Sequence, residues 1–216
     1  MYLPKHFEEH DLGVLHALLK SHPLGAWVTH AEGALIANHI PFLLDADRGE
    51  RGTLVGHVAR ANPIWKSFSK DAASLVIFQG PQAYITPSWY PSKREHGKVV
   101  PTWNYAVVHA YGLPRAIEDK SWLLQLVTRL TAAHEAGAAV PWKVADAPAD
   151  YIDKMLGAIV GIEIPIARLE GKWKMSQNRT LPDQLGTIAG LQGQGDANAR
   201  EVAALVQQRT STKQGG

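Results

Sequence analysis

The spacing of apolar residues predicts a chain of short strands and amphipathic helices. Leucines recur at helical spacing over residues 7–20, and Pro23 ends that segment. Elsewhere apolar and polar residues alternate over short runs, which is the period of a half-buried strand. These runs predict strands at 26–29, 34–44, 54–58, 75–78, 83–86, 105–116 and 160–169. Further helices are predicted at 62–68, 122–134, 149–156, 181–192 and 197–209.

Short turns join several of the predicted strands. Ala31-Glu32-Gly33 separates the first two, and Gly80-Pro81 separates 75–78 from 83–86. Consecutive hairpins imply antiparallel pairing, because a parallel sheet needs a crossover helix between most strands. Six or seven such strands in ~150 residues predict a small closed or split barrel, an arrangement that removes exposed strand edges.

The chain carries no internal repeat and no low-complexity block. We expect residues 1–209 to form a single domain and residues 210–216 to form a disordered polar tail. Residues 87–101 contain three prolines and a charged run, which predict a long irregular loop. Loops of this length inside a domain are often functional.

Composition narrows the classes of function. Of 216 residues, 45% are apolar and 19% are charged, which is typical of a globular protein. The formal net charge of +2 makes no electrostatic case for binding nucleic acid or an anionic membrane. The absence of cysteine excludes disulfides and thiolate catalysis. No apolar run is long enough to cross a membrane and the first residues lack a signal segment, so we expect a cytoplasmic protein.

Several catalytic signatures are absent. The chain has no glycine-rich dinucleotide or phosphate loop and no nucleophile elbow, and His134-Glu135 is not followed by a second histidine at zinc-protease spacing. The ten histidines are scattered singly, so no local spacing supports a metal site and none is predicted.

Two segments combine polar and aromatic groups that suit a flat anionic cofactor. Arg60 and Asn62 follow a strand and precede a helix, where a guanidinium and free amides can bind an anion. The alternative is a capped helix with an exposed arginine and a packed His57. Trp103-Asn104-Tyr105 offers a stacking plane and both kinds of hydrogen-bonding group. The alternative there is a pair of aromatic residues that close a barrel end.

A third segment, residues 172–179, is basic and polar. Lys174, Gln177 and Arg179 lie in it, and such groups can surround a phosphate or a ribityl chain. The alternative is a solvated connector, as short basic runs usually are. The three segments together favour FMN over these alternatives.

Five segments, taken in order along the chain, carry a family resemblance. Together they resemble the PaiB family, whose members are described as FMN-binding negative transcriptional regulators. The resemblance covers residues 1 to about 191. The segments are MYLPKHF, GHVARANPIW, YITPSWYPSK, VPTWNY and KMSQNR.

The resemblance implies a fold, a cofactor and an assembly. The fold is an antiparallel split β-barrel of α+β class, similar to pyridoxamine-phosphate-oxidase-like proteins, with peripheral and C-terminal helices. The cofactor is FMN, held between the subunits of a homodimer. A small-molecule ligand is a further possible partner.

The resemblance also implies roles for individual residues. Arg60 and Asn62 are expected near the phosphate or ribityl end of the flavin, with His57 on the strand beneath it. His39, in the ANHIPF segment, is expected to contact the ring. The remaining expected contacts are Trp103, Asn104 and Tyr105 across the subunit interface, and Lys174, Gln177 and Arg179 from the C-terminal segment.

Three alternatives to an indirect, flavin-linked regulator remain open. The first is a flavin-dependent oxidoreductase or oxidase of a small substrate, with His39 or His57 as an acid–base group. The second is a haem-binding or haem-degrading protein that uses His39, His57 or His109 as a ligand. The third is a direct DNA-binding repressor, which the small net charge argues against.

Overall fold

The computed structural model describes the backbone of residues 1–212, which divides into two compact units. Unit 1 comprises Met1–Leu18, Gln79–Val108 and the chain from Glu170 onward. Unit 2 comprises Leu19–Phe78 and His109–Leu169. Within residues 1–212, no helix has the length and apolar character needed to cross a membrane.

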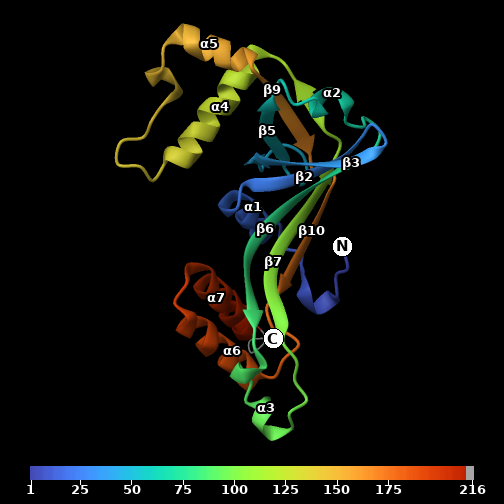
Figure 1. The fold of residues 1–216 in the computed structure, drawn as a ribbon, viewed down its shortest axis with the longest axis vertical. Coiled ribbons are helices and arrows are strands. Elements are labelled where there is room, and N and C mark those ends of the chain that lie inside the picture. Colours follow the sequence, from blue (N-terminus) through green and yellow to red (C-terminus); the bar gives the residue numbers. More distant parts are fainter. Residues whose placement is uncertain (213–216) are drawn as a thin grey trace. The chain divides into compact units, whose positions relative to one another are not determined.

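Unit 2 contains antiparallel strands in two sheets (Figure 1). One has the strand order β6-β2-β3, and the other has the order β4-β5-β9-β8. Every strand pair recorded in unit 2 is antiparallel. The strands are β2 (Leu24–Ala31), β3 (Ala34–Pro41), β4 (Leu43–Asp45), β5 (Thr53–Ala59), the start of β6 (Ser74–Ile85), the end of β7 (Thr102–Gly112), β8 (Arg115–Ile117) and β9 (Ile159–Pro165). The helices are the end of α1 (Leu12–Ser21), α2 (Ile64–Ser67), α4 (Lys120–Glu135), η3 (Val144–Asp146) and α5 (Ala149–Gly157).

Helix α4 covers the β4–β5 part of the second sheet. Leu126 and Leu130 on its apolar face join Val55 of β5 in a buried cluster. The Asp119 side chain accepts a hydrogen bond from the Trp122 backbone N–H at 2.7 Å and so caps the first turn of the helix. These contacts explain why the predicted helix at 122–134 forms where its leucines predict it.

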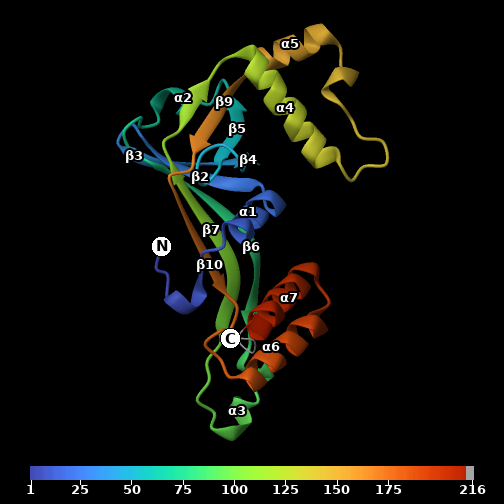
Figure 2. The same cartoon turned by 180° about the vertical axis from the view of Figure 1, so that it is seen from behind.

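Unit 1 contains the strand order β1-β10-β7-β6 and a pair of helices that lie side by side, α6 (Leu181–Gln194) and α7 (Ala197–Thr212) (Figure 2). Thr180 caps α6, and Gly195 ends it with a positive φ of 78°, a conformation that favours glycine. The other elements are η1 (Lys5–Phe7), β1 (Glu8–Glu9), the start of α1, the rest of β6, η2 (Pro87–Trp89), α3 (Ser92–Glu95), the start of β7, and β10 (Arg168–Lys174).

The predicted loop over residues 87–101 is only partly irregular, because it contains η2 and α3. It is also fixed to α6 at two points. The Ser92 backbone N–H and hydroxyl both donate to the Asp183 carboxylate, at 3.2 and 2.7 Å. Trp89 lies against Gly186 and Gly190, where a Cβ atom would come within 2.0 and 2.2 Å of it. The glycines of α6 therefore make room for this side of the loop.

The predicted hairpin around Gly80-Pro81 is wrong, because β6 continues through both residues as one twelve-residue strand. Gly80 does not have the positive φ of a turn residue. Its role is close approach, since an added Cβ would lie 2.8 Å from Leu18 and 3.2 Å from the carbonyl oxygen of Ala106.

Other predicted elements differ mainly at their ends. The predicted helix at 7–20 begins only at Leu12, because Glu8 and Glu9 pair with β10. The predicted strands at 34–44, 105–116 and 160–169 are each divided into two, and β10 extends the last pair to Lys174.

The C-terminal helix continues to Thr212, beyond the predicted end at residue 209. The Thr210 hydroxyl lies 2.7 Å from Oε1 of Gln184, which ties this last turn to α6. Residues 213–216 of the predicted tail lie outside the described residues. The single domain expected over residues 1–209 stays a prediction.

Candidate functional site

Three cationic side chains, Lys172, Lys174 and Arg179, gather in unit 1 at the end of β10, and we call them the cation cluster. The Lys174 ammonium donates to the Trp103 carbonyl oxygen at 2.9 Å and to the Thr102 hydroxyl. Burial lowers the pKa of Lys174, and the like charges of Lys172 and Arg179 lower it further. A negative charge placed among these groups would reverse that shift.

The recorded partners of the other two cations are neutral. The Lys172 ammonium donates to the Tyr2 carbonyl oxygen at 3.0 Å and lies 5.5 Å from the centre of the Tyr105 ring. The Arg179 guanidinium lies 4.9 Å from the centre of the Tyr90 ring. In the part of the chain that the structure describes, no recorded hydrogen bond or ion pair joins the cluster to a carboxylate. Its charge is therefore available to an external anion.

The turn after β10 shapes this site. The Gln177 amide accepts from the Met175 backbone N–H at 2.6 Å and donates to the Trp173 carbonyl oxygen at 2.5 Å. Ser176, between them, has a positive φ of 62°. The buried Asn104 amide donates to the Ser176 hydroxyl at 2.9 Å. Within the described residues, the Oδ1 atom of Asn104 has no hydrogen-bond partner, which leaves a buried acceptor for a donor from elsewhere.

Trp103 offers an aromatic surface close to the same elements. Its indole N–H donates to Oε1 of Gln82 at 3.0 Å, which fixes the ring, and 46% of the residue stays exposed. The exposed Tyr84 ring lies 6.1 Å away, centre to centre. The structure thus brings six of the ten predicted site residues into unit 1: Trp103, Asn104, Tyr105, Lys174, Gln177 and Arg179.

Arg60, in unit 2, is already engaged by protein groups. Its Nε donates to the Gly157 carbonyl oxygen at 2.8 Å, and a terminal nitrogen donates to the Ile159 carbonyl oxygen at 3.1 Å. The other terminal nitrogen forms a 2.5 Å ion pair with Glu118. The guanidinium charge that the sequence assigns to an anion site is compensated here by a carboxylate.

Asn62 precedes α2, whose N-cap residue is Pro63, and its side chain binds the first backbone N–H of the helix. Its Oδ1 accepts from the Ile64 backbone N–H at 3.1 Å, and its Nδ2 donates to Oδ1 of Asn38 at 2.7 Å. The Nδ2 atom of Asn38 is buried and has no partner among the described residues. Asn38 was not a predicted site residue, because a single amide inside a predicted strand gives no sequence signal for a site.

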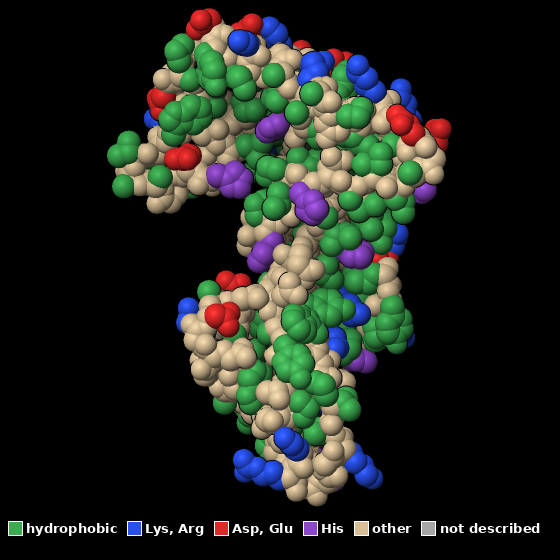
Figure 3. All heavy atoms as spheres, in the orientation of Figure 1, with side chains coloured by type: hydrophobic (Ala, Val, Ile, Leu, Met, Phe, Trp, Pro, Cys, Tyr) green, Lys and Arg blue, Asp and Glu red, His purple; other side chains and the backbone are tan. Residues whose placement is uncertain are grey.

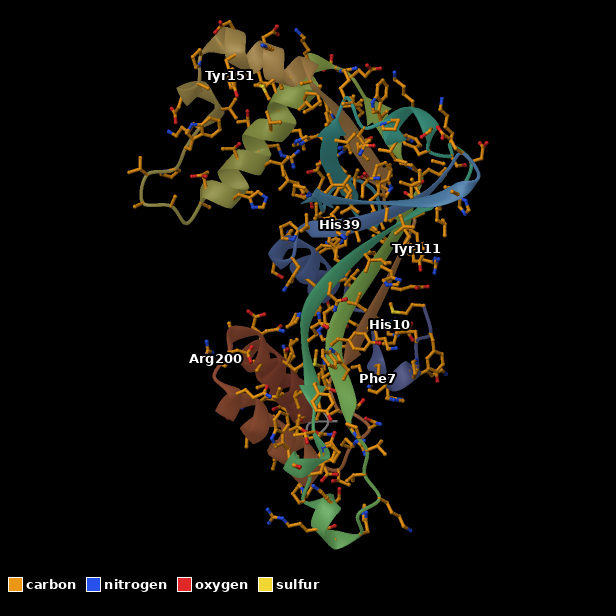
Figure 4. The ribbon with its side chains drawn as sticks, viewed as in Figure 1. Phe7, His10, His39, Tyr111, Tyr151 and Arg200 are labelled. Carbon is orange, nitrogen blue, oxygen red and sulfur yellow. The ribbon has the colours of Figure 1, made fainter. Side chains whose placement is uncertain are left out.

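The two predicted histidines of unit 2 differ in environment. His57 lies on β5, and its Nδ1 atom is buried without a partner in the described chain. Burial lowers the pKa of His57, which keeps the imidazole neutral near pH 7. His39 lies on β3 and is exposed (Figure 4). Among residues 1–212, no group of three or more His, Asp or Glu side chains is arranged to hold a metal ion.

Comparison with known proteins identifies the family. A family model described as "Putative FMN-binding domain" matches residues 1–168. The protease synthase and sporulation protein PAI 2 of Bacillus subtilis is 32% identical over 97% of this chain and 98% of that protein. This chain belongs to the PaiB family of FMN-binding proteins. An uncharacterized protein of Emericella nidulans is 34% identical over 99% of both chains.

Solved structures confirm the fold expected for this PaiB-family protein. The flavocytochrome Anf3 of Azotobacter vinelandii matches with a TM-score of 0.57 at 14% identity, over 81% of this chain and 70% of that one. The FAD and haem binding protein of Mycobacterium smegmatis matches with a TM-score of 0.56 at 16% identity, over 77% and 73%. The predicted α+β split barrel is confirmed, and so is FMN as the cofactor class.

Three residues of the site in the PaiB-family protein escaped the sequence prediction. Lys172 lies in the basic segment 172–179, for which the sequence leaves a solvated connector as the alternative. In the structure it lies on the strand β10. Tyr90 belongs to the SWYPS segment, which was assigned to an irregular loop. Ser176 lies in the same basic segment as Lys172 but was not chosen as a site residue, because its role depends on a left-handed backbone that serine rarely adopts.

The neutral state of His57 predicts how stability changes with pH. Because folding lowers its pKa below the usual value of 6.5, the unfolded chain binds more protons below that pH, and the free energy of unfolding falls as pH decreases. We expect His57→Gln to lose less stability than the unchanged protein between about pH 7 and pH 5, measured by urea unfolding. Equal losses in the two proteins would contradict this assignment.

Proposed function

We propose that this PaiB-family protein binds FMN with the phosphate at the cation cluster of unit 1. The observation that carries the proposal is the set of three cations whose recorded partners are neutral. A phosphate supplies the missing negative charge, and hydrogen bonds between charged groups and phosphate are among the stronger ones in proteins. By contrast, Glu118 already compensates the charge of Arg60.

Neighbouring groups fit the rest of a flavin. The exposed face of Trp103 suits stacking on an apolar ring, and the unpartnered Oδ1 of Asn104 suits a hydroxyl or ring N–H donor. When bound, FMN supplies reversible electron transfer, while the protein binds and orients it. The cofactor roles of His39, His57, Arg60 and Asn62 stay predictions, since these residues belong to unit 2.

We propose that the protein is a homodimer. Strand β3 ends the strand order of its sheet, and seven of its residues from Ala34 to His39 and at Pro41 are at least partly exposed. Leu35 is 66% exposed and Ile36 is 37% exposed, so apolar side chains face outward along an edge strand. An apolar edge of this kind is normally covered by another chain or blocked by charges, and β3 carries no charged Lys, Arg, Asp or Glu.

The regulatory role is proposed as an indirect one. The relative PAI 2 of Bacillus subtilis is named for protease synthesis and sporulation, which supports a role in gene expression. The net charge of +2 does not favour a repressor that binds DNA directly. The input to such a regulator is the redox state of the flavin or a small molecule bound by the protein.

A flavin titration tests the cofactor proposal. Purified protein is titrated with FMN by isothermal calorimetry, and its mass in solution is measured with and without the flavin. We expect saturable binding of one FMN per chain and the mass of a dimer. Absence of binding at micromolar protein would contradict the cofactor proposal, and the mass of a monomer would contradict the dimer.

A second experiment tests the indirect role. The affinity of the flavin-loaded protein for promoter DNA is compared with its affinity for unrelated DNA of the same length. We expect weak binding without preference for the promoter. Tight promoter-selective binding that falls steeply with salt would identify a direct repressor instead.

A further inference from the structure

Helices α4 and α5 of unit 2, together with the segment that joins them, line an open hollow of about 820 Å³. The volume lies in the range of pockets that hold small organic molecules, roughly 300–1,000 Å³. None of the ten predicted flavin-site residues lines it. The hollow is therefore a feature that the flavin does not explain.

The lining is mostly apolar and partly aromatic. Leu124 of α4, Ile152 and Leu156 of α5, and Val144 of η3 contribute aliphatic surface. Trp142 forms part of the wall and is 47% exposed. Hydrophobic side chains also gather on the outer surface of this part of unit 2, where Tyr151 lies on α5 (Figures 3 and 4). An exposed indole beside aliphatic side chains in a concave surface suits a flat apolar molecule.

The wall that carries Trp142 is held in place by hydrogen bonds. The Trp142 backbone N–H donates to the Glu135 carboxylate at 3.0 Å, at the end of α4. The next backbone N–H, from Lys143, donates to the Asp146 carboxylate at 2.8 Å and starts η3. Val144, which lines the hollow, is itself mostly buried. The segment is therefore a fixed wall, which limits the ordering cost of binding.

The two charged side chains that line the hollow, Asp153 and Lys143, differ in whether another side chain compensates them. The Asp153 carboxylate forms a 2.6 Å ion pair with Lys120, so its charge is compensated. For the Lys143 ammonium, no hydrogen bond or ion pair is recorded within residues 1–212. The hollow thus combines an apolar body with one available positive charge at its edge.

We propose that this hollow binds an aromatic carboxylate, with its rings against Trp142 and the aliphatic wall and its carboxylate near Lys143. The ligand satisfies each unused feature: the apolar volume, the exposed indole face and the unpaired ammonium. Such a site would supply the small-molecule input, one of the two inputs proposed above for the regulatory role. The inference stands on the hollow itself and does not depend on flavin binding.

Calorimetric titration with 1-naphthylacetate, and with the uncharged analogue 2-(1-naphthyl)ethanol, tests the proposal on the full chain. We expect one saturable site per chain for both probes. Lys143→Gln should weaken the acid about fivefold, the size of an exposed ion pair, and change the alcohol by less than about twofold. Trp142→Ala should weaken both probes by about tenfold.

Matched controls keep the result interpretable. Lys154→Gln removes an exposed lysine of α5 that does not line the hollow, and it should leave both affinities unchanged. FMN affinity should be unchanged in all three variants, which also shows that they fold. No binding of either probe, or equal loss for acid and alcohol in Lys143→Gln, would overturn the proposal. Loss of the dimer in folded Trp142→Ala would also overturn it, because the hollow would then be covered by a second copy.

Discussion

Replacing Lys174 and Arg179 together with glutamine is expected to weaken FMN binding by about 3–6 kcal/mol, if each cation contributes a charged hydrogen bond of about 1.5–3 kcal/mol to the phosphate. Glutamine keeps a polar side chain at both positions and removes the two positive charges. The change also removes the buried charge of Lys174, whose pKa is lowered by burial and then by repulsion from Lys172 and Arg179, so the folded protein should lose little stability. Calorimetric titration with FMN measures the effect.

The comparison variant for this experiment is Arg60→Gln. Its guanidinium is bound by Glu118 and by the carbonyl oxygens of Gly157 and Ile159, so its loss should affect local stability more than FMN affinity. Riboflavin, which lacks the phosphate, should bind the double variant and the unchanged protein equally. If Arg60→Gln abolishes FMN binding and the double variant does not, the phosphate belongs to unit 2 and our assignment is wrong.

Replacing Gly190 with valine is expected to destabilise the protein by about 3 kcal/mol and to weaken FMN binding as well. A Cβ atom there would lie 2.2 Å from the Trp89 ring, so α6 and the 87–101 segment have to separate. That segment leads directly into Trp103 and Asn104, which we place at the flavin. Urea unfolding and FMN titration measure the two effects.

Helix α6 offers a matched control in Gly193→Val. A Cβ atom at Gly193 meets nothing within 4 Å, so valine should change stability by only a few tenths of a kcal/mol, the size of a helix-propensity effect. The double variant Gly190→Val/Trp89→Ala should be less destabilised than the sum of its parts, because the added side chain then has room. Equal effects of the two glycine substitutions would show that the close contact between Gly190 and the Trp89 ring does not determine stability.

Much of the fold could be predicted because its signals are local. Leucine spacing located α4, and Asp119 caps it through an ordinary side-chain contact. The hairpin of β2 and β3 forms where Gly33 adopts a positive φ of 79°. The division into split-barrel strands followed from consecutive antiparallel runs and from the family resemblance.

The errors arose where a residue serves a distant contact. Gly80 looks like a turn residue, yet it admits Leu18 and the Ala106 backbone, which are far away in the sequence. β10 escaped the pattern because its Lys172 and Lys174 are charged, and a charged run predicts a solvated connector. The burial of Lys172 depends on strand pairing with β1 and on an aromatic neighbour that no short segment reveals.

The sequence identified the kinds of residue in the candidate site better than it identified which groups those residues contact. The basic segment, the aromatic triplet and the Arg60 segment each form structured groups, but Arg60 pairs with Glu118, a residue 58 positions away. A guanidinium in a sequence shows that an anion can be bound. It does not show whether that anion is an external ligand or, as for Arg60, a carboxylate of the same chain.

The tryptophans of this protein are distributed in a way that gives each proposed site its own optical signal. Trp103 and Trp142 are half-exposed at the flavin site and at the hollow, whereas Trp27 and Trp173 are buried. Indole emission changes with its surroundings, so Trp103→Phe should reduce the response to FMN and Trp142→Phe the response to the aromatic acid. Comparing each single variant with the unchanged protein then shows which site a change in emission reports, without an attached dye.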